Sequence, residues 1–160
     1  MITTNNTTIF EALSEVSNTE STFKSLDDVK IIKLNPHTSR KGNLVAVEGG
    51  STIPFEVKRV FYIYGVADQE KRGRHAHKTT EQFLICLSGE CKVICSDGDN
   101  FKEVVLNSPA TGLYIPKDIW DEQLYTTPDT LLLVLSNTHY NRNDYIENFE
   151  EFKEYRNGPI

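Results

Sequence analysis

The sequence predicts an all-β fold, an antiparallel barrel or sandwich with one short helix at its C-terminal end and an appendage at its N-terminal end. Short runs of β-branched and aromatic residues follow one another from residue 29 to residue 136, and turn signals such as Ser88-Gly89 separate them. No long helical pattern lies between these runs. Many short strands joined by tight turns are typical of antiparallel barrels and sandwiches rather than of doubly wound sheets.

The N-terminal part of the chain differs from the rest in composition. Residues 1–25 are rich in Thr, Asn and Ser and contain one short helical pattern, formed by Ile9, Phe10, Leu13 and Val16. We therefore expect a polar arm over residues 1–25, partly helical, ahead of one domain over residues 26–160. A chain of 160 residues is long enough for this domain to bury roughly two-thirds of its unfolded surface.

Nine strands are expected along the domain, each a run of β-type residues bounded by turn-forming residues. They cover residues 29–34, 43–48, 55–64, 81–87, 90–95, 101–106, 112–115, 120–125 and 131–136. The last run is apolar on both faces from Leu131 to Leu135, which is typical of a central strand.

The end of the chain changes from a strand pattern to a helical one. Asp144, followed three positions later by Glu147, is typical of an N-terminal capping box. Apolar and aromatic side chains then recur at helical spacing, at Tyr145, Ile146, Phe149, Phe152 and Tyr155. We expect a closing amphipathic helix whose aromatic stripe packs on the barrel or on a partner subunit.

Composition and charge argue against several classes of protein. A net charge of -6 argues against nucleic-acid binding, which needs a basic face. No basic segment followed by an apolar one opens the chain, and no apolar run reaches ~18 residues, so we expect a cytoplasmic protein without a membrane partner. Three cysteines, Cys86, Cys91 and Cys95, lack CxxC spacing and are expected to be buried as small apolar residues.

Two histidines two positions apart are the strongest sign of chemistry in the chain. His75 and His77 lie in an extended segment, where alternate residues share a face. Such a pair can hold a metal ion or transfer protons near neutral pH, because the unperturbed pKa of imidazole is ~6.5. Glu81 follows, and Arg72 and Arg74 flank the pair, which favours a functional site over solvated strand histidines or a hydrogen-bonded core histidine.

A third arginine lies on an apolar face. In the run 55–64, Arg59 shares its face with Phe55, Val57, Phe61 and Ile63. A guanidinium on such a face is costly without an anion or a hydrogen-bonding partner. We therefore expect Arg59 to be either a member of a structural ion pair or a ligand contact inside the barrel.

The histidine motif is similar to the first motif of the cupin barrels. In that motif two His and one Glu point inward and often ligate a metal. Cupins usually add a second motif, Pro-x-Gly-x-x-His, and the matching stretch here begins at Pro116. In this stretch Asp118 takes the place of the Gly and Asp121 that of the His.

Over residues 29–155 the chain resembles one branch more closely, the sugar-nucleotide 3,4-ketoisomerases or WxcM-like cupins. These enzymes supply dTDP-3-keto-6-deoxyhexoses for bacterial deoxyamino sugars. The motifs that carry the resemblance are Lys58-Arg59-Val60, Tyr62-Ile63, Arg72-Gly73, His75-Ala76-His77-Lys78, Glu81-Gln82, Ser108-Pro109-Ala110, Gly112-Leu113-Tyr114 and Trp120.

The resemblance implies a cupin-type jelly-roll barrel and a homodimer with exchanged N-terminal strands. It also implies a dTDP-linked keto-deoxyhexose as ligand, no metal and no cofactor, with His75 and His77 as acid and base. Arg59 and Arg72 fall on family positions associated with the active site. The full set of candidate substrate-binding residues is Arg59, Arg72, Tyr62, Lys78, Glu81, Arg40, Trp120 and Asp121.

The implied reaction suits a pair of imidazoles. Moving a carbonyl from C4 to C3 of a hexose removes the proton on C3 while O4 gains one, and the enediol then loses the proton on O3 while C4 receives one. Each positioned acid or base contributes ~10²–10⁴ in rate. We expect one His to act at carbon and the other to shuttle between O3 and O4, with His75 favoured for the carbon step and Arg59 stabilising the enediolate.

Other functions use the same residues differently. A metal-dependent cupin would bind Fe(II) or Mn(II) through His75, His77, Glu81 and Asp121. A sugar-nucleotide 3,5-epimerase would use a His with an Asp partner on a similar barrel. A non-catalytic sugar-nucleotide-binding module would keep the pocket without turnover. Asp121, the main departure from the motif, either orients a histidine or caps a loop.

Overall fold

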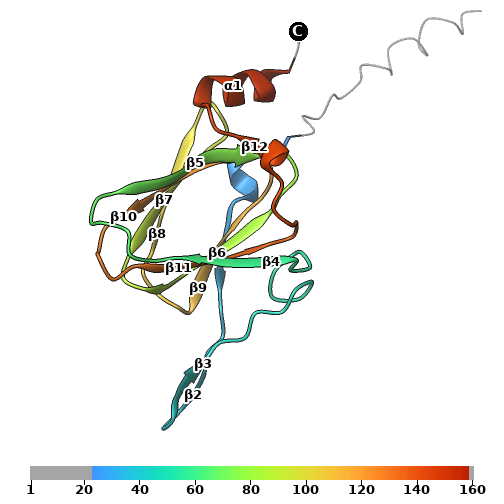
Figure 1. Cartoon of the computed structure of the whole chain (residues 1–160). Coiled ribbons are helices and arrows are strands. Elements are labelled where there is room, and N and C mark those ends of the chain that lie inside the picture. The colour runs from blue at the N-terminus through green and yellow to red at the C-terminus, as the bar shows by residue number, and fades with distance from the viewer. Residues whose placement is uncertain (1–22, 159–160) are drawn as a thin grey trace, which may run out of the picture.

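The computed structural model describes residues 23–158 as two five-stranded antiparallel sheets that face each other, with a projecting hairpin and a C-terminal helix (Figure 1). The all-β prediction is confirmed. Most of the arm expected over residues 1–25, including its helical pattern, lies outside the described residues.

Strand order places neighbours in sequence on opposite sheets. The first sheet contains β1 (Lys30–Lys33), β9 (Thr111–Ile115), β6 (Gln82–Ser88), β11 (Leu131–Ser136) and β4 (Arg59–Ile63), in that order. The second contains β12 (Tyr145–Ile146), β5 (Lys71–His77), β10 (Trp120–Tyr125), β7 (Cys91–Ser96) and β8 (Phe101–Leu106). The chain crosses between the sheets at most connections, as in a jelly roll. The consecutive strands β4 and β5 therefore lie on different sheets.

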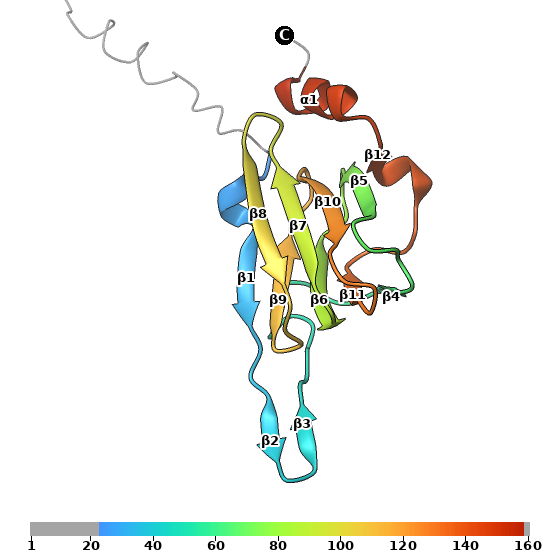
Figure 2. The same cartoon turned by 90° about the vertical axis from the view of Figure 1, so that its left-hand side faces the viewer.

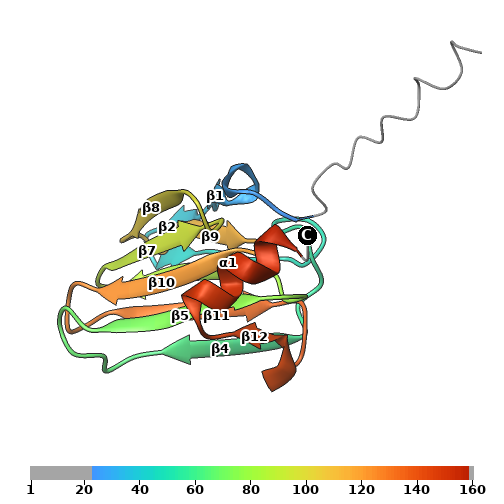
Figure 3. The same cartoon turned by 90° about the horizontal axis from the view of Figure 1, so that it is seen from above.

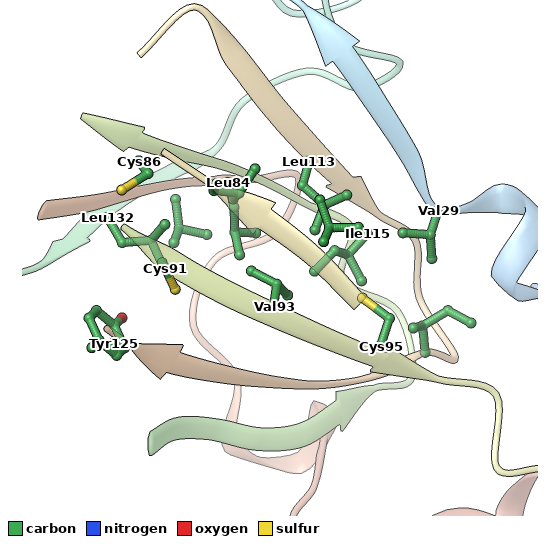
Figure 4. Close-up of a cluster of buried hydrophobic side chains, with 14 residues drawn as sticks. Val29, Leu84, Cys86, Cys91, Val93, Cys95, Leu113, Ile115, Tyr125 and Leu132 are labelled. Atoms are coloured by element: carbon green, nitrogen blue, oxygen red, sulfur yellow. The ribbon is translucent and has the colours of Figure 1, made fainter. Parts of the chain in front are cut away.

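Inward-facing residues of both sheets form the main core, which Figure 4 shows. Cys91, Val93 and Cys95 alternate along β7 and are fully buried, and Cys86 faces them from β6. The prediction of buried thiols is confirmed. Burial raises the pKa of the Cys91 thiol to about 12, so this group behaves as a small apolar residue.

The outer face of the first sheet is covered by the chain itself. Leu132 and Val134 of β11 face the main core, whereas Leu133 and Leu135 face outward. A second apolar cluster forms there with residues of the segment 45–57, which we call the covering segment. Among them are Val45, Val47, Ile53 and Phe55. Because β11 pairs with both β6 and β4, the expectation of a strand with neighbours on both sides is confirmed.

This covering segment explains where the strand predictions were wrong. Val45, Val47, Phe55 and Val57 are apolar because they pack on the outer face, not because they belong to a strand. The strands observed are β3 (Gly42–Leu44) and β4, which begins at Arg59. β3 pairs with β2 (His37–Ser39) in a hairpin that was not predicted and that projects from the barrel (Figure 2).

The C-terminal helix α1 (Phe149–Asn157) begins later than predicted. Its N-cap is Asn148, whose side chain accepts hydrogen bonds from the backbone N–H groups of Glu150 and Glu151. Asp144 instead ends a short 3₁₀ helix, η2 (Arg142–Asp144), so the predicted capping box is wrong. A second 3₁₀ turn, η1 (Leu26–Asp28), precedes β1.

The aromatic stripe of α1 packs on the barrel, as one of the two expectations stated. Phe152 is fully buried against Trp120, with ring centroids 5.8 Å apart, and Phe149 meets the same indole at 5.2 Å. Seen from above, α1 lies across the second sheet (Figure 3). Within residues 23–158 no helix is long and apolar enough to span a membrane.

Candidate active site

A cavity of about 340 Å³ lies between β4 of the first sheet and β5 of the second. Five strands contribute its wall, because inward-facing residues of both sheets meet there. The lining residues are Arg59, Phe61, Tyr62, Ile63, Arg72, Gly73, His75, Gln82, Gln123 and Tyr145. The wall therefore combines an apolar side with two guanidinium groups, an imidazole, two amides and two phenols.

The two histidines of β5 lie side by side, as the alternation predicts. Their ring centroids are 4.9 Å apart in an edge-on arrangement, and Tyr145 of β12 lies 5.0 Å from His75 and 4.5 Å from His77. His75 lines the cavity, whereas His77 is only 5 % exposed and lies behind this wall. The site thus has one accessible imidazole and one buried imidazole in contact with it.

A bulge in β5 precedes the histidines. Gly73 and Arg74 both have positive φ, at 74° and 61°, and the register with β10 shifts between Asp121 and Glu122. A bulge re-aims the side chains next to it. Here it leaves His75 facing the cavity, while the exposed Arg74 lies near Glu122 at 3.8 Å on the outer surface, outside the site.

The carboxylate that reaches the histidines is Asp144. Its Oδ2 lies 2.8 Å from Nδ1 of His77, and both side chains are about 95 % buried. Burial opposes ionisation of Asp144, but hydrogen bonds from His77, Thr79 and Thr80 outweigh it and hold the pKa of this carboxyl well below its usual range. Nε2 of His77 is buried and has no hydrogen-bond partner among residues 23–158.

Arg59 occupies the cavity wall without a carboxylate partner. Its guanidinium lies 4.6 Å from the ring centroid of Phe61 and 5.2 Å from that of Tyr140. Within the described part of the chain, no carboxylate oxygen lies within 4.0 Å of Arg59 or of Arg72. Of the two roles expected for Arg59, the structure therefore favours the ligand contact. Cation–π contacts stabilise the charge and leave its N–H donors free for an anion.

Asp121 lies on the inward face of β10, opposite His75 in the register with β5. It is 1 % exposed and accepts a hydrogen bond of 2.9 Å from Nε2 of Gln123, whose Oε1 accepts one from Tyr125. Asp121 therefore supports Gln123 in the cavity wall and is not a loop cap. It does not itself line the cavity.

Four predicted substrate-binding residues lie elsewhere. Glu81 accepts hydrogen bonds from Tyr114 at 2.6 Å and from Asn137 at 3.0 Å, because the neighbouring Gln82 takes the inward position of β6. Trp120 faces outward under α1. Lys78 is exposed and donates to the carbonyl of Asn143, and Arg40 lies in the turn of the projecting hairpin. Tyr62 lines the cavity but is 63 % exposed, at its rim.

The predicted metal-ligand set is not assembled. Glu81 is turned to Tyr114 and Asn137, away from the histidines. Among residues 23–158 no group of three or more His, Cys, Asp or Glu side chains lies close enough together to hold a metal ion.

The sequence did not reveal several residues of the site. Asp144 and Tyr145 were assigned to the helix, because their spacing from Glu147 and Phe149 matches a helical start. Their contacts with His77 span 67 and 68 positions of sequence, and no local pattern reports such a distance. Strand alternation could have predicted Gln123, because it lies on the same face of its strand as Asp121.

Comparisons with known proteins give one consistent result. Residues 27–157 match the family model described as "FdtA: WxcM-like, C-terminal". The chain is 42 % identical over 126 residues to TDP-4-oxo-6-deoxy-alpha-D-glucose-3,4-oxoisomerase of Aneurinibacillus thermoaerophilus, an alignment that covers 79 % of this chain and 91 % of that protein.

Solved structures agree with the sequence match. A 3,4-ketoisomerase from Helicobacter canadensis is similar with a TM-score of 0.80 and 40 % identity, covering 82 % of this chain and 98 % of that one. A mutant of the 3,4-ketoisomerase QdtA from Thermoanaerobacterium thermosaccharolyticum, in complex with TDP-4-keto-6-deoxyglucose, gives a TM-score of 0.77 and 38 % identity, covering 80 % and 93 %.

Proposed function

The chain belongs to the FdtA-type family of WxcM-like proteins, and from this premise we propose that it is a sugar-nucleotide 3,4-ketoisomerase that converts dTDP-4-keto-6-deoxyglucose into a dTDP-3-keto-6-deoxyhexose. The product is a precursor of deoxyamino sugars. The observation that carries the proposal is the pair of imidazoles in contact at one wall of a cavity that also holds two guanidinium groups.

The reaction needs four short proton transfers, at C3, O4, O3 and C4. His75 lines the cavity and is the residue assigned to the transfers at carbon. His77 lies in ring contact with it and exchanges the protons of the two oxygens. Two such groups are each worth ~10²–10⁴ in rate. The site therefore offers two imidazoles in contact for the acid and base steps of an enediol mechanism.

Arg59 and Arg72 are assigned to the anionic parts of the substrate. A nucleoside diphosphate brings negative charge, and both guanidinium groups line the cavity without an internal carboxylate partner among the described residues. Charge-assisted hydrogen bonds to an anion are about twice as strong as neutral ones. Arg59 lines the same cavity as His75, so its charge can also stabilise an enediolate formed there.

The direct test incubates the purified protein with dTDP-4-keto-6-deoxyglucose in D₂O and follows the C3 and C4 positions by NMR. We expect deuterium at C4 of a 3-keto product and, through reversal, at C3 of recovered substrate. His75→Asn and His77→Asn should each abolish turnover, whereas His139→Asn, which changes an exposed histidine, should not. Tight binding of the nucleotide without isotope exchange would identify a non-catalytic binding module instead.

We also propose that the active form is a homodimer built through the N-terminal strands. The hairpin of β2 and β3 is exposed along its length and projects from the barrel (Figure 2). A lone two-stranded hairpin is marginally stable in water. Next to its base lies an apolar groove of about 450 Å³ that includes Val45, Leu87, Leu133 and Leu135, a suitable seat for the hairpin of a second copy.

Light scattering after gel filtration checks the dimer. The full chain should elute with twice the monomer mass of 18.2 kDa, and a variant in which a short Gly-Ser linker replaces the whole hairpin, residues 37–44, should elute as a monomer. A full chain that stays monomeric at micromolar concentration would rule out the exchange.

A further inference from the structure

The hydrogen bonds of Asp144 determine the tautomer of His77. Oδ1 of Asp144 accepts from the backbone N–H of Thr79 at 2.7 Å and from the Thr79 hydroxyl at 2.6 Å. Oδ2 accepts from the Thr80 hydroxyl at 2.5 Å and faces Nδ1 of His77 at 2.8 Å. A carboxylate has about four acceptor sites, so these four contacts fill them.

The proton positions follow from this count. Thr138 lies 2.5 Å from the Thr80 hydroxyl, and since Thr80 gives its proton to Asp144, Thr138 is the donor of that pair. An ionised Asp144 can only accept. Nδ1 of His77 must therefore carry the hydrogen in this contact, and in the neutral ring the lone pair is on Nε2.

We propose that Asp144 is a positioning residue of the isomerisation: it holds His77 as the Nδ1–H tautomer, so that Nε2 is the atom that takes up and returns protons. This inference rests on the proposed function of His77. Nε2 has no partner among residues 23–158, and the two rings beside His77, those of His75 and Tyr145, both line the cavity. When Nε2 takes a proton, the Asp144 carboxylate stabilises the imidazolium.

A purely structural role for Asp144 predicts something different. Its backbone carbonyl accepts from the N–H of Lys78, and its side chain ties η2 to the end of β5. If this tie were its whole purpose, replacing Asp144 would lower stability and the folded fraction without changing the tautomer of His77. Measuring both the tautomer of His77 and kcat therefore distinguishes the two roles.

The first experiment needs no variant. Nitrogen-15 NMR of the wild-type protein reports which ring nitrogen of His77 carries hydrogen. The signals of His77 are assigned as those that disappear in the His77→Asn variant. At a pH where the ring is neutral we expect a protonated Nδ1 and a bare Nε2. A protonated Nε2 in the neutral ring would overturn the proposal, whether or not the protein turns over a sugar nucleotide.

The second experiment uses Asp144→Asn, which keeps the shape of the side chain. The new amide presents an N–H to Nδ1 once its oxygen accepts from Thr79, so we expect His77 to change to the Nε2–H tautomer. We expect kcat to fall about 10²–10⁴-fold, with KM changed less than threefold because Asp144 does not line the cavity. A variant with lower kcat and an unchanged tautomer would show a structural role only, and one with wild-type kcat would show no role.

Asp118→Asn is the matched control. Asp118 is 1 % exposed and accepts from Tyr155 at 2.7 Å, and its backbone N–H donates to the carbonyl of His77. Its side chain contacts neither imidazole in any hydrogen bond of the described residues. We expect a comparable loss of stability and an unchanged tautomer of His77. If the wild-type protein shows the expected tautomer and no isotope exchange, the proposed function fails and the tautomer assignment stands.

Discussion

Arg59 shows how a charged residue is kept available in an apolar wall. Moving an unpaired guanidinium out of water is costly, and most proteins offset this cost with a carboxylate. Here the rings of Phe61 and Tyr140 lie beside it instead. A carboxylate at this place would compete with the substrate, whereas an aromatic face does not.

Replacing Arg59 by Ala should weaken substrate binding with little effect on folding. Hydrogen bonds to charged groups contribute roughly 1.5–3 kcal/mol, so KM for the sugar nucleotide should rise about 10–100-fold. Steady-state kinetics measures this change. Arg74→Ala, which removes an exposed guanidinium near Glu122 outside the cavity, should keep the wild-type KM. Equal effects of the two substitutions would contradict the assignment.

Asp144 should also give stability a specific pH dependence. Its pKa is lower in the folded protein than in the unfolded chain, so its ionised form stabilises the fold above about pH 4. This contribution is lost as the pH falls below that value. In urea unfolding, the difference in unfolding free energy between wild type and Asp144→Asn should therefore shrink as the pH falls from 5 toward 3. A difference that stays constant down to pH 3 would be inconsistent with the lowered pKa.

At the scale of elements, strand periodicity is the most readable part of the sequence. The bounds of β8, β10 and β11 were predicted correctly, since turn-forming residues end each of these runs. The face shared by His75 and His77 follows from the same rule. Local pattern is enough where one face of a strand meets the core and the other does not.

The errors all come from contacts that local pattern does not report. Residues 55–58 resemble a strand because alternate residues of this segment pack on an apolar sheet face. The family resemblance implies a substrate contact at Trp120, whereas in the structure this residue packs under α1, a helix that lies far along the chain. Asp144 resembles a helix cap through its spacing from Glu147, but its four hydrogen-bond donors come from residues 77–80, which local sequence does not show. Where the local sequence allows two roles for a residue, its tertiary contacts determine which role it takes.

The α1 helix contributes to stability through one buried ring. Phe152 is fully buried between the helix and Trp120, so Phe152→Ala should lower the unfolding free energy by about 3–5 kcal/mol. Chemical denaturation followed by tryptophan fluorescence measures the loss. Glu151→Ala, an exposed position of the same helix, should stay within about 0.5 kcal/mol of wild type. A small effect of Phe152→Ala would mean that the helix is not anchored to the sheet.

Considered as a whole, the molecule keeps its apolar main core apart from the polar cavity. The thiols of Cys86, Cys91 and Cys95 lie in the main core, whereas the polar cavity lies at the edge between β4 and β5. The two regions share β6 and β10, whose residues face one or the other according to their position along the strand.

The three thiols should not react with a thiol reagent until the barrel unfolds. With the pKa of Cys91 raised to about 12 by burial, about one thiol in ten thousand is ionised at pH 8, and the pKa values of Cys86 and Cys95 are raised as well. A thiol reagent at pH 8 should therefore label none of the three in native protein and all three in urea. Fast labelling of the native protein would show that the core opens on the time scale of the assay.

The composition of the cavity wall bears on how such a protein diversifies. Each of five strands contributes side chains to the wall, and the positions between them, such as Ala76 beside His75, belong to packing clusters. Where lining and packing positions alternate, as at His75 and Ala76, a substitution in the wall leaves the neighbouring packing cluster unchanged. New specificities can accumulate one codon at a time, without insertions and without redesign of the scaffold.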